Sequence, residues 1–170
     1  MPVQVRVDEK AGSIFLICVF YAVHMVEEFS FGFVPWADRY FGSFDWTQNL
    51  LGNFMFFVCV FSACYFYYSD QQKYLWAGMA AAMWILSNSF LHISCTILSG
   101  EYSPGVVTAA LVYVPGGTYF LVRWGKKGWL TFNNLLFSFF IGGMVFMLIP
   151  TFARSIHFHA RSAKLFHLVN

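Results

Sequence analysis

The chain has 170 residues and a formal net charge of +2, and only 11% of its residues are charged, against 59% hydrophobic and 22% aromatic. About a quarter of the residues of a soluble globular protein are charged, so this composition excludes a water-soluble domain. It also excludes disordered and collagen-like chains, because 22 Phe, 9 Tyr and 6 Trp supply a large apolar surface and 13 Gly with 5 Pro follow no repeat. An integral membrane protein of one domain remains.

Five apolar segments each approach the ~20 residues that a helix needs to cross about 30 Å of hydrocarbon. Strict alternation of polar and apolar residues is absent, which favours helices over barrel strands. We therefore predict an all-α integral membrane bundle of five transmembrane helices in residues 1–152, followed by a basic, interfacial tail in residues 153–170. The predicted spans are 13–33, 49–68, 75–98, 106–122 and 130–152.

The connections between these spans are short and rich in Trp and Tyr, as in the aromatic belts at membrane surfaces. Basic residues of the short loops lie four to one on the side of the N-terminus: Lys73, Arg123, Lys126 and Lys127 against Arg39. This bias predicts a cytoplasmic N-terminus for a multi-pass protein. Inside the fourth span, the Pro-Gly-Gly run at 115–117 predicts a kink or a thinning of the helix.

Two adjacent carboxylates lie inside the first span, in the sequence HMVEE at residues 24–28. On a helix, His24 and Glu28 share one face at i,i+4, with Glu27 beside them at i,i+3. An acidic residue at mid-membrane costs about 2.5–3.5 kcal/mol, so this pair needs compensation by protonation, a cation or a metal.

Further polar residues lie in the third span and at the start of the fourth. NSFLH at 88–92 places Asn88 and His92 at i,i+4, with Cys95 on the same face, and YSPGVVT at 102–108 adds the hydroxyls of Tyr102 and Thr108. The four cysteines lie within the spans, where the simplest interpretation is that of small buried hydrophobes.

The predicted topology brings these motifs to one depth. Because the first and third spans run in the same direction, Glu28 lies roughly 8 Å and His92 roughly 9 Å from the far ends of their helices. Thr108 lies a few ångströms into the span that starts on that far side. Asn53, near the start of the second span, reaches the same level, so we expect all of these groups in one leaflet.

In this order and separation, the three motifs resemble the His-x-x-Glu-Glu, Asn-x-x-x-His and Tyr-x-Pro-Gly-x-x-Thr signatures of the HXXEE family of small integral membrane proteins. The resemblance covers residues 13 to about 122. It marks positions and implies no particular reaction, because the family has no established biochemical function.

A purely structural role for these groups would be hydrogen bonding between helices. Such bonds average about 0.6 kcal/mol in membranes, too little to offset two buried glutamates. The first functional hypothesis is therefore a mononuclear site for a divalent metal, zinc or iron, with an open position that activates water or oxygen against a lipid bond. Its predicted ligands are His24, Glu28 or Glu27, His92 and, as fourth ligand or support, Asn88.

The second hypothesis keeps the residues and removes the metal. One of Glu27 and Glu28 acts as a protonated general acid, the other or His24 as base, and Tyr102 is a further catalytic candidate. Aromatic faces stabilise a developing carbocation, which suits isomerisation or cyclisation of a sterol or isoprenoid. In outline such a protein is similar to the emopamil-binding-protein sterol isomerases, by architectural analogy only. The aromatic faces are those of Phe20, Phe56, Phe90 and Trp84, and the candidate substrate-binding residues are Asn53, Thr108, Phe20, Trp84 and Phe90.

Proton or cation transport is a third possibility, which the absence of an inverted repeat disfavours. We therefore expect a membrane enzyme that modifies a lipid or isoprenoid through its His/Glu/Asn site. Its expected partners are membrane lipid, a hydrophobic small-molecule substrate and a second copy of itself in a homo-oligomer. Nucleic acid is not among them, because the chain has no basic stripe.

Overall fold

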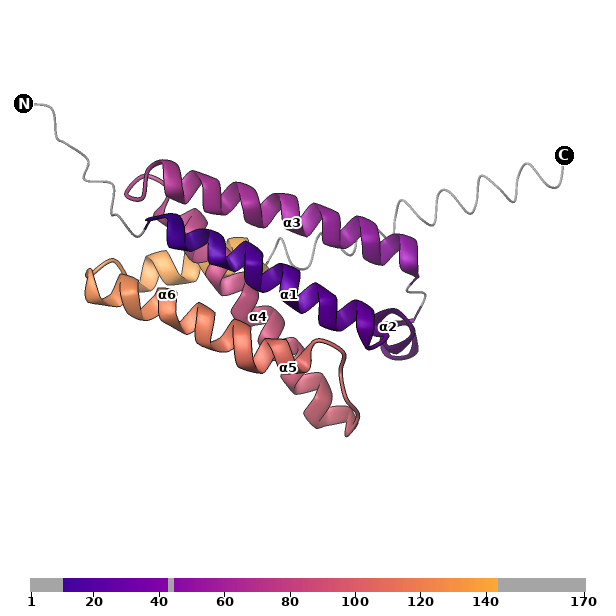
Figure 1. Ribbon diagram of the computed structural model, residues 1–170. Coiled ribbons are helices and arrows are strands. Elements are labelled where there is room, and N and C mark those ends of the chain that lie inside the picture. Colours follow the sequence, from indigo (N-terminus) through magenta and orange to yellow (C-terminus); the bar gives the residue numbers. More distant parts are fainter. Residues whose placement is uncertain (1–10, 43–44, 144–170) are drawn as a thin grey trace, which may run out of the picture.

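The computed structural model describes residues 11–42 and 45–143, and every regular element in these two ranges is helical (Figure 1). Four helices are long and apolar enough to cross a membrane, as expected of a multi-pass membrane protein. They follow the first four predicted spans closely and comprise Ala11–Ser30, Trp46–Ser69, Leu75–Ser99 and Val106–Lys126.

The fifth predicted span is described only in part. Phe132–Gly143 is an apolar helix, but its described length is shorter than a membrane span. It packs closely on the third spanning helix, because a Cβ atom on Gly142 would lie 2.7 Å from the carbonyl oxygen of Ala80. Residues 144–152 and the tail lie outside the described residues, so the count of five helices and the interfacial tail stay predictions.

Local sequence signals set the ends of the spanning helices. A 3-10 turn (Ala11–Phe15) leads into α1 (Leu16–Ser30). A capping box starts α3 (Trp46–Ser69): the Asp45 side chain accepts from the Gln48 amide at 2.9 Å, and the Gln48 side chain accepts from the Asp45 amide. After α4 (Leu75–Ser99), Gly100 takes a φ of 67°, which glycine adopts at low cost.

The connection after α1 is more than the short, Trp- and Tyr-rich link that the sequence predicted. It forms a short helix, α2 (Phe33–Phe41), at the end of α1 (Figure 1). Three side chains of this helix are buried, those of Val34, Trp36 and Ala37. Pro35 lies in its first turn, where a missing backbone N–H costs little. The belt residue Trp36 is therefore packed against protein.

The last spanning helix changes its winding along its length. It consists of α5 (Val106–Thr108), a π-helical segment (Ala109–Tyr113) and α6 (Val114–Lys126). The π-helical segment directly precedes Pro115, whose ring would otherwise press on the preceding turn. The sequence predicted a kink or a thinning at the Pro-Gly-Gly run, whereas the structure has a wider, π-helical turn before it and α6 runs through residues 115–117.

α4 is the central helix of the bundle and packs against α1, α3 and α6. The core on the N-terminal side of the bundle is aromatic, with Trp124 donating a hydrogen bond to the Tyr67 hydroxyl at 2.9 Å. Large apolar side chains such as Phe54 and Leu111 are exposed on the outer surface. An apolar outer surface of this kind suits a helix bundle surrounded by hydrocarbon.

Gly117→Ala tests the close packing of α6 on α4. The added Cβ would lie 2.6 Å from Cγ of Leu86, so we expect a loss of about 1–3 kcal/mol in the free energy of unfolding. The measurement is denaturant-induced unfolding of the purified protein in detergent micelles. Gly52→Ala is the control, since its Cβ meets nothing within 4 Å, and should be neutral or stabilising by up to about 1 kcal/mol. Equal effects of the two changes would contradict the packing.

Candidate functional site

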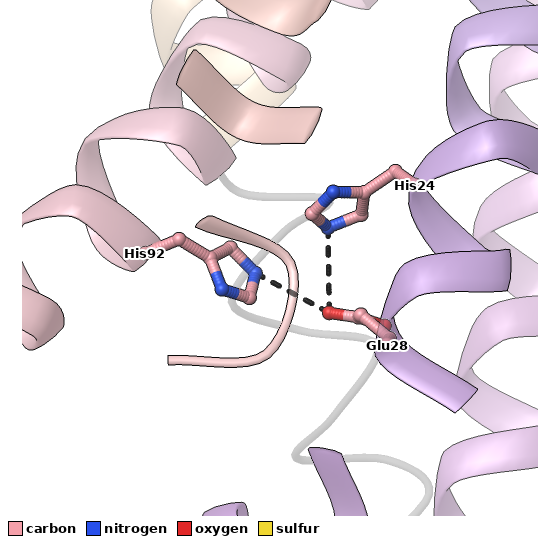
Figure 2. Close-up of side chains that lie close together, drawn as sticks. All are labelled: His24, Glu28 and His92. Carbon is pink, nitrogen blue, oxygen red and sulfur yellow. Dashed lines mark ion pairs between the residues drawn. The ribbon is translucent and has the colours of Figure 1, made fainter. Parts of the chain in front are cut away.

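Three side chains from two helices converge inside the bundle. His24 and Glu28 lie one turn apart on α1, and His92 comes from α4 (Figure 2). Nε2 of His24 and Nε2 of His92 each lie 3.3 Å from the same carboxylate oxygen, Oε1 of Glu28. The three ligand-type atoms all lie within 4.8 Å of one another. The sequence motifs on the first and third spans therefore meet.

The cluster is shielded from its surroundings. His24, Glu28 and His92 are 1%, 5% and 2% exposed. Within residues 11–42 and 45–143, no other group of three His, Cys, Asp or Glu side chains comes this close together. Cys95, which shares a predicted face with His92, is not a member of the group.

The outer nitrogen of each imidazole contacts a hydroxyl. Nδ1 of His24 lies 2.8 Å from Oγ1 of Thr108, and Nδ1 of His92 lies 3.0 Å from Oγ of Ser103. Both hydroxyls belong to the segment that enters the last spanning helix. They fix the ring orientations, so that the Nε2 atoms point at Glu28.

Gly105 lies between the two histidine rings. A Cβ atom there would lie 2.7 Å from Cε1 of His24 and 2.8 Å from Cε1 of His92, and its φ of +104° is one that other residues rarely adopt. On the other side, the ring of Tyr113 packs against His24 with centroids 4.5 Å apart. The glycine of YSPGVVT thus lets the backbone pass close to both histidine rings.

Glu27 faces a different partner, the start of the last spanning helix. Its Oε1 accepts from the amides of Gly105 and Val107 at 3.1 and 3.0 Å, and its Oε2 accepts from the amide of Thr108 at 2.6 Å. The Tyr102 hydroxyl also donates to Oε1. A carboxylate here satisfies free amides and complements the positive end of the helix dipole.

Tyr102 lies in the hairpin between α4 and α5. Burial and the hydrogen bond to Glu27 raise the pKa of Tyr102 above its ordinary value, so the hydroxyl is protonated at neutral pH and donates. The structure thus pairs Glu27 with Tyr102 and sets both against the helix start. Their catalytic roles stay predictions.

Three further candidates, Asn88, Trp84 and Asn53, differ in whether their polar atoms have a hydrogen-bond partner. Asn88 and Trp84 are buried on α4, and neither Oδ1 of Asn88 nor Nε1 of Trp84 has a hydrogen-bond partner in the described part of the chain. Asn53 accepts from the Tyr21 hydroxyl at 2.6 Å and donates to Asn49.

The phenylalanines named as substrate-binding candidates, Phe20 and Phe90, differ in their placement. Phe90 is 74% exposed on the outside of α4, so the structure does not bring it to the site. Phe20 packs against Gly116 of α6. Phe56, the other aromatic candidate, contacts Trp84 with ring centroids 5.4 Å apart.

Three site residues were missed from the sequence: Ser103, Gly105 and Tyr113. The first two lie inside YSPGVVT, so the motif carried a usable signal. Tyr113 stands among apolar residues outside any motif, and nothing in the sequence singled it out.

A family model described as a protein of unknown function with an HXXEE motif matches residues 15–120. The chain belongs to this HXXEE family. The matched range includes all three motifs and ends before the helix Phe132–Gly143, so the His/Glu/His cluster lies wholly within the family's common part.

A relative in Bacillus subtilis (strain 168), called uncharacterized protein YrkK, is 24% identical over 95 residues. The matched region covers 55% of this chain and 60% of that protein's length. No solved structure matches the chain.

Glu27→Gln tests the contact between α1 and the last spanning helix. An amide cannot match a charge that accepts from three backbone amides, so we expect a loss of about 1–3 kcal/mol in stability. Hydrogen exchange of the Val107 and Thr108 amides, followed by mass spectrometry, should show faster exchange. In the control Glu101→Gln, which loses an exposed ion pair with Arg39, stability should change by at most about 1 kcal/mol. Unchanged protection in Glu27→Gln would refute the assignment.

Proposed function

We propose that this protein is a membrane-embedded, metal-dependent enzyme acting on a lipid or isoprenoid substrate, with zinc or iron held by His24, Glu28 and His92. The observation that carries the proposal is the convergence of both Nε2 atoms on one Glu28 oxygen at 3.3 Å. Two imidazoles and one carboxylate are a common ligand set for both metals.

The distances suit a metal ion. Ligand atoms about 2.0–2.1 Å from a tetrahedral zinc lie about 3.3–3.4 Å from each other. The two nitrogen-to-oxygen distances of 3.3 Å match that edge and exceed those of ordinary charged hydrogen bonds. The third edge, between the imidazole nitrogens, is within 4.8 Å, and an inward movement of the rings closes it to the length that a metal requires.

The hydrogen bonds around His24 also favour a cation. The Thr108 hydroxyl donates to the carbonyl oxygen of Gly105 at 3.2 Å, so it accepts from Nδ1 of His24. A neutral His24 then turns the lone pair of Nε2 towards the Glu28 carboxylate, and Nε2 has no hydrogen-bond partner among the described residues. Two acceptors at this distance repel each other unless a positive charge lies between them. Either a proton on Nε2 or a divalent metal supplies that charge, and the metal also offsets the burial of Glu28.

Three protein ligands leave a coordination position open for chemistry. A bound metal would there supply a Lewis acid for polarising an oxygen atom or activating water. Thr108 and Ser103 hold the imidazoles in place, while Glu27 fixes the segment that carries both hydroxyls. Because the site is buried in helices long enough to span a membrane, the substrate that reaches it is expected to be hydrophobic.

Elemental analysis of the detergent-purified protein tests the metal directly. We expect about one zinc or iron per chain, and at least a tenfold loss in His24→Ala, His92→Ala and Glu28→Gln, since each change removes a ligand. Glu101→Gln is the control: it alters an exposed carboxylate that pairs with Arg39, away from the histidines, and should retain the metal.

A folded protein that takes up no zinc or iron even after incubation with either ion would exclude the metal site. If such protein still isomerised or cyclised an isoprenoid in a way that depended on Glu28, the metal-free acid–base mechanism would replace it. Ion flux in sealed liposomes would instead support transport.

Thr108→Val tests the support of His24. The change keeps the shape of the side chain but removes the acceptor for Nδ1, so we expect metal affinity to fall by about 10–100-fold without loss of the ligands. Competition with a chelator of known affinity measures this. Thr118→Val, at an exposed position on α6, should leave the affinity unchanged, and equal affinities in all three proteins would show that the hydroxyl does not support the site.

A further inference from the structure

Three buried polar atoms near the cluster have no hydrogen-bond partner within the described residues. They are the hydroxyl of Tyr113, Nε1 of Trp84 and Oδ1 of Asn88. Their residues are 0%, 3% and 9% exposed. Leaving such an atom unpaired costs about 1–3 kcal/mol, so three of them in one region point to a ligand that pairs with them.

Ring contacts and helix geometry place the three residues around one region. Tyr113 packs on His24, and its ring centroid lies 6.2 Å from that of Trp84. Trp84, Asn88 and His92 follow each other at i, i+4 and i+8 on one face of α4. The ring centroids of His24 and His92 are 4.9 Å apart, so these five residues form one connected cluster of side chains.

The donor and acceptor pattern identifies the ligand's polar group. Trp84 offers a donor, the Tyr113 hydroxyl offers a donor, and Asn88 offers an acceptor. A single alcohol hydroxyl accepts twice and donates once, so it satisfies all three. A carbonyl would leave Asn88 unpaired, and a carboxylate would also lie near the buried charge of Glu28.

Within residues 11–42 and 45–143, the charges near the site do not favour a phosphorylated head group. Binding of phosphate calls for Arg or Lys. On the hairpin side of the bundle, the basic residue in the described ranges is Arg39, whose exposed side chain already pairs with Glu101. The other cations of the described spans and loops, such as Arg123 and Lys126, lie at the opposite end. The expected ligand is therefore neutral.

An apolar groove begins at the same tryptophan. It has a volume of about 280 Å³, lies between α3, α4 and the helix Phe132–Gly143, and extends from Trp84 towards Trp76 and Phe66. Its lining is almost wholly apolar, as a hydrocarbon chain requires. Trp84 thus borders both this cluster of five side chains and the groove.

We propose that the site binds a neutral lipid alcohol, with its hydroxyl among Tyr113, Trp84 and Asn88 and its hydrocarbon chain in the groove beyond Trp84. This inference names the substrate class of the proposed enzyme and rests on it for the chemistry. The binding itself depends only on the three polar atoms. It places the hydroxyl end on the side of His24 and His92, with the chain pointing away from them.

The test is native mass spectrometry of the full chain released from detergent micelles, with 1-hexadecanol and hexadecanoic acid as probes. We expect saturable binding of one hexadecanol, at least tenfold tighter than that of the acid, and about a tenfold loss of this affinity in Tyr113→Phe. Tyr119→Phe, an exposed position on the same helix, should bind hexadecanol like the parent. Equal binding of the two probes, or an unchanged affinity in Tyr113→Phe, would overturn the proposal.

Two further measurements distinguish alcohol binding from a buried water at Tyr113 and from the proposed metal centre. Thermal unfolding without probe should be unchanged or stabilised in Tyr113→Phe, because an unpaired hydroxyl is removed. A lower melting temperature with unchanged binding would mean that a buried water holds the hydroxyl, and would overturn the inference. Elemental analysis of the same samples reports the metal separately: alcohol binding without metal would refute only the metal centre, and metal without alcohol binding only the substrate class.

Discussion

Two carboxylates buried side by side on a membrane helix are the constraint on which the rest of the site depends. Each needs compensation, and the structure supplies it in two different ways: backbone amides at a helix start for Glu27, and two imidazoles for Glu28. Both solutions draw on residues 102–108, which give amides to Glu27 and hydroxyls to the histidines. One short segment therefore serves both charges.

This division explains the spacing of the His-x-x-Glu-Glu motif. Adjacent residues on a helix point about 100° apart, so Glu27 and Glu28 cannot share a partner. Glu28 lies one turn after His24 and faces it, which the i,i+4 spacing requires. Glu27 turns towards the hairpin instead. The second glutamate of the motif thus belongs to the His/Glu/His cluster, and the first holds the segment whose hydroxyls orient the histidines.

The sequence predicted that the motifs meet but not that Glu27 and Glu28 have different partners. Helix rise and direction placed His24, Glu28 and His92 at one depth, and the structure joins them. The i,i+4 spacing put Glu28 on the face of His24, but nothing in the sequence indicated that Glu27 accepts from the amides at the start of the last spanning helix. Tyr113 was out of reach for another reason: the π-helical segment Ala109–Tyr113 shifts the face of every later residue, so a regular period cannot assign its direction. α2 was missed because Pro35 and the polar residues after it read as a loop.

The geometry also bears on the choice between the two glutamates as a source of chemistry. Glu27 accepts four hydrogen bonds, so protonating it would break contacts that hold the start of the last spanning helix. Among the described residues, the Glu28 carboxylate contacts the two imidazoles and no backbone or hydroxyl donor. It is thus the carboxylate whose charge state can change without unfolding a helix. Because Thr108 touches both Glu27 and His24, any loosening of the Glu27 contacts reaches the histidine through that one residue, and the structural and chemical roles of the pair are coupled there.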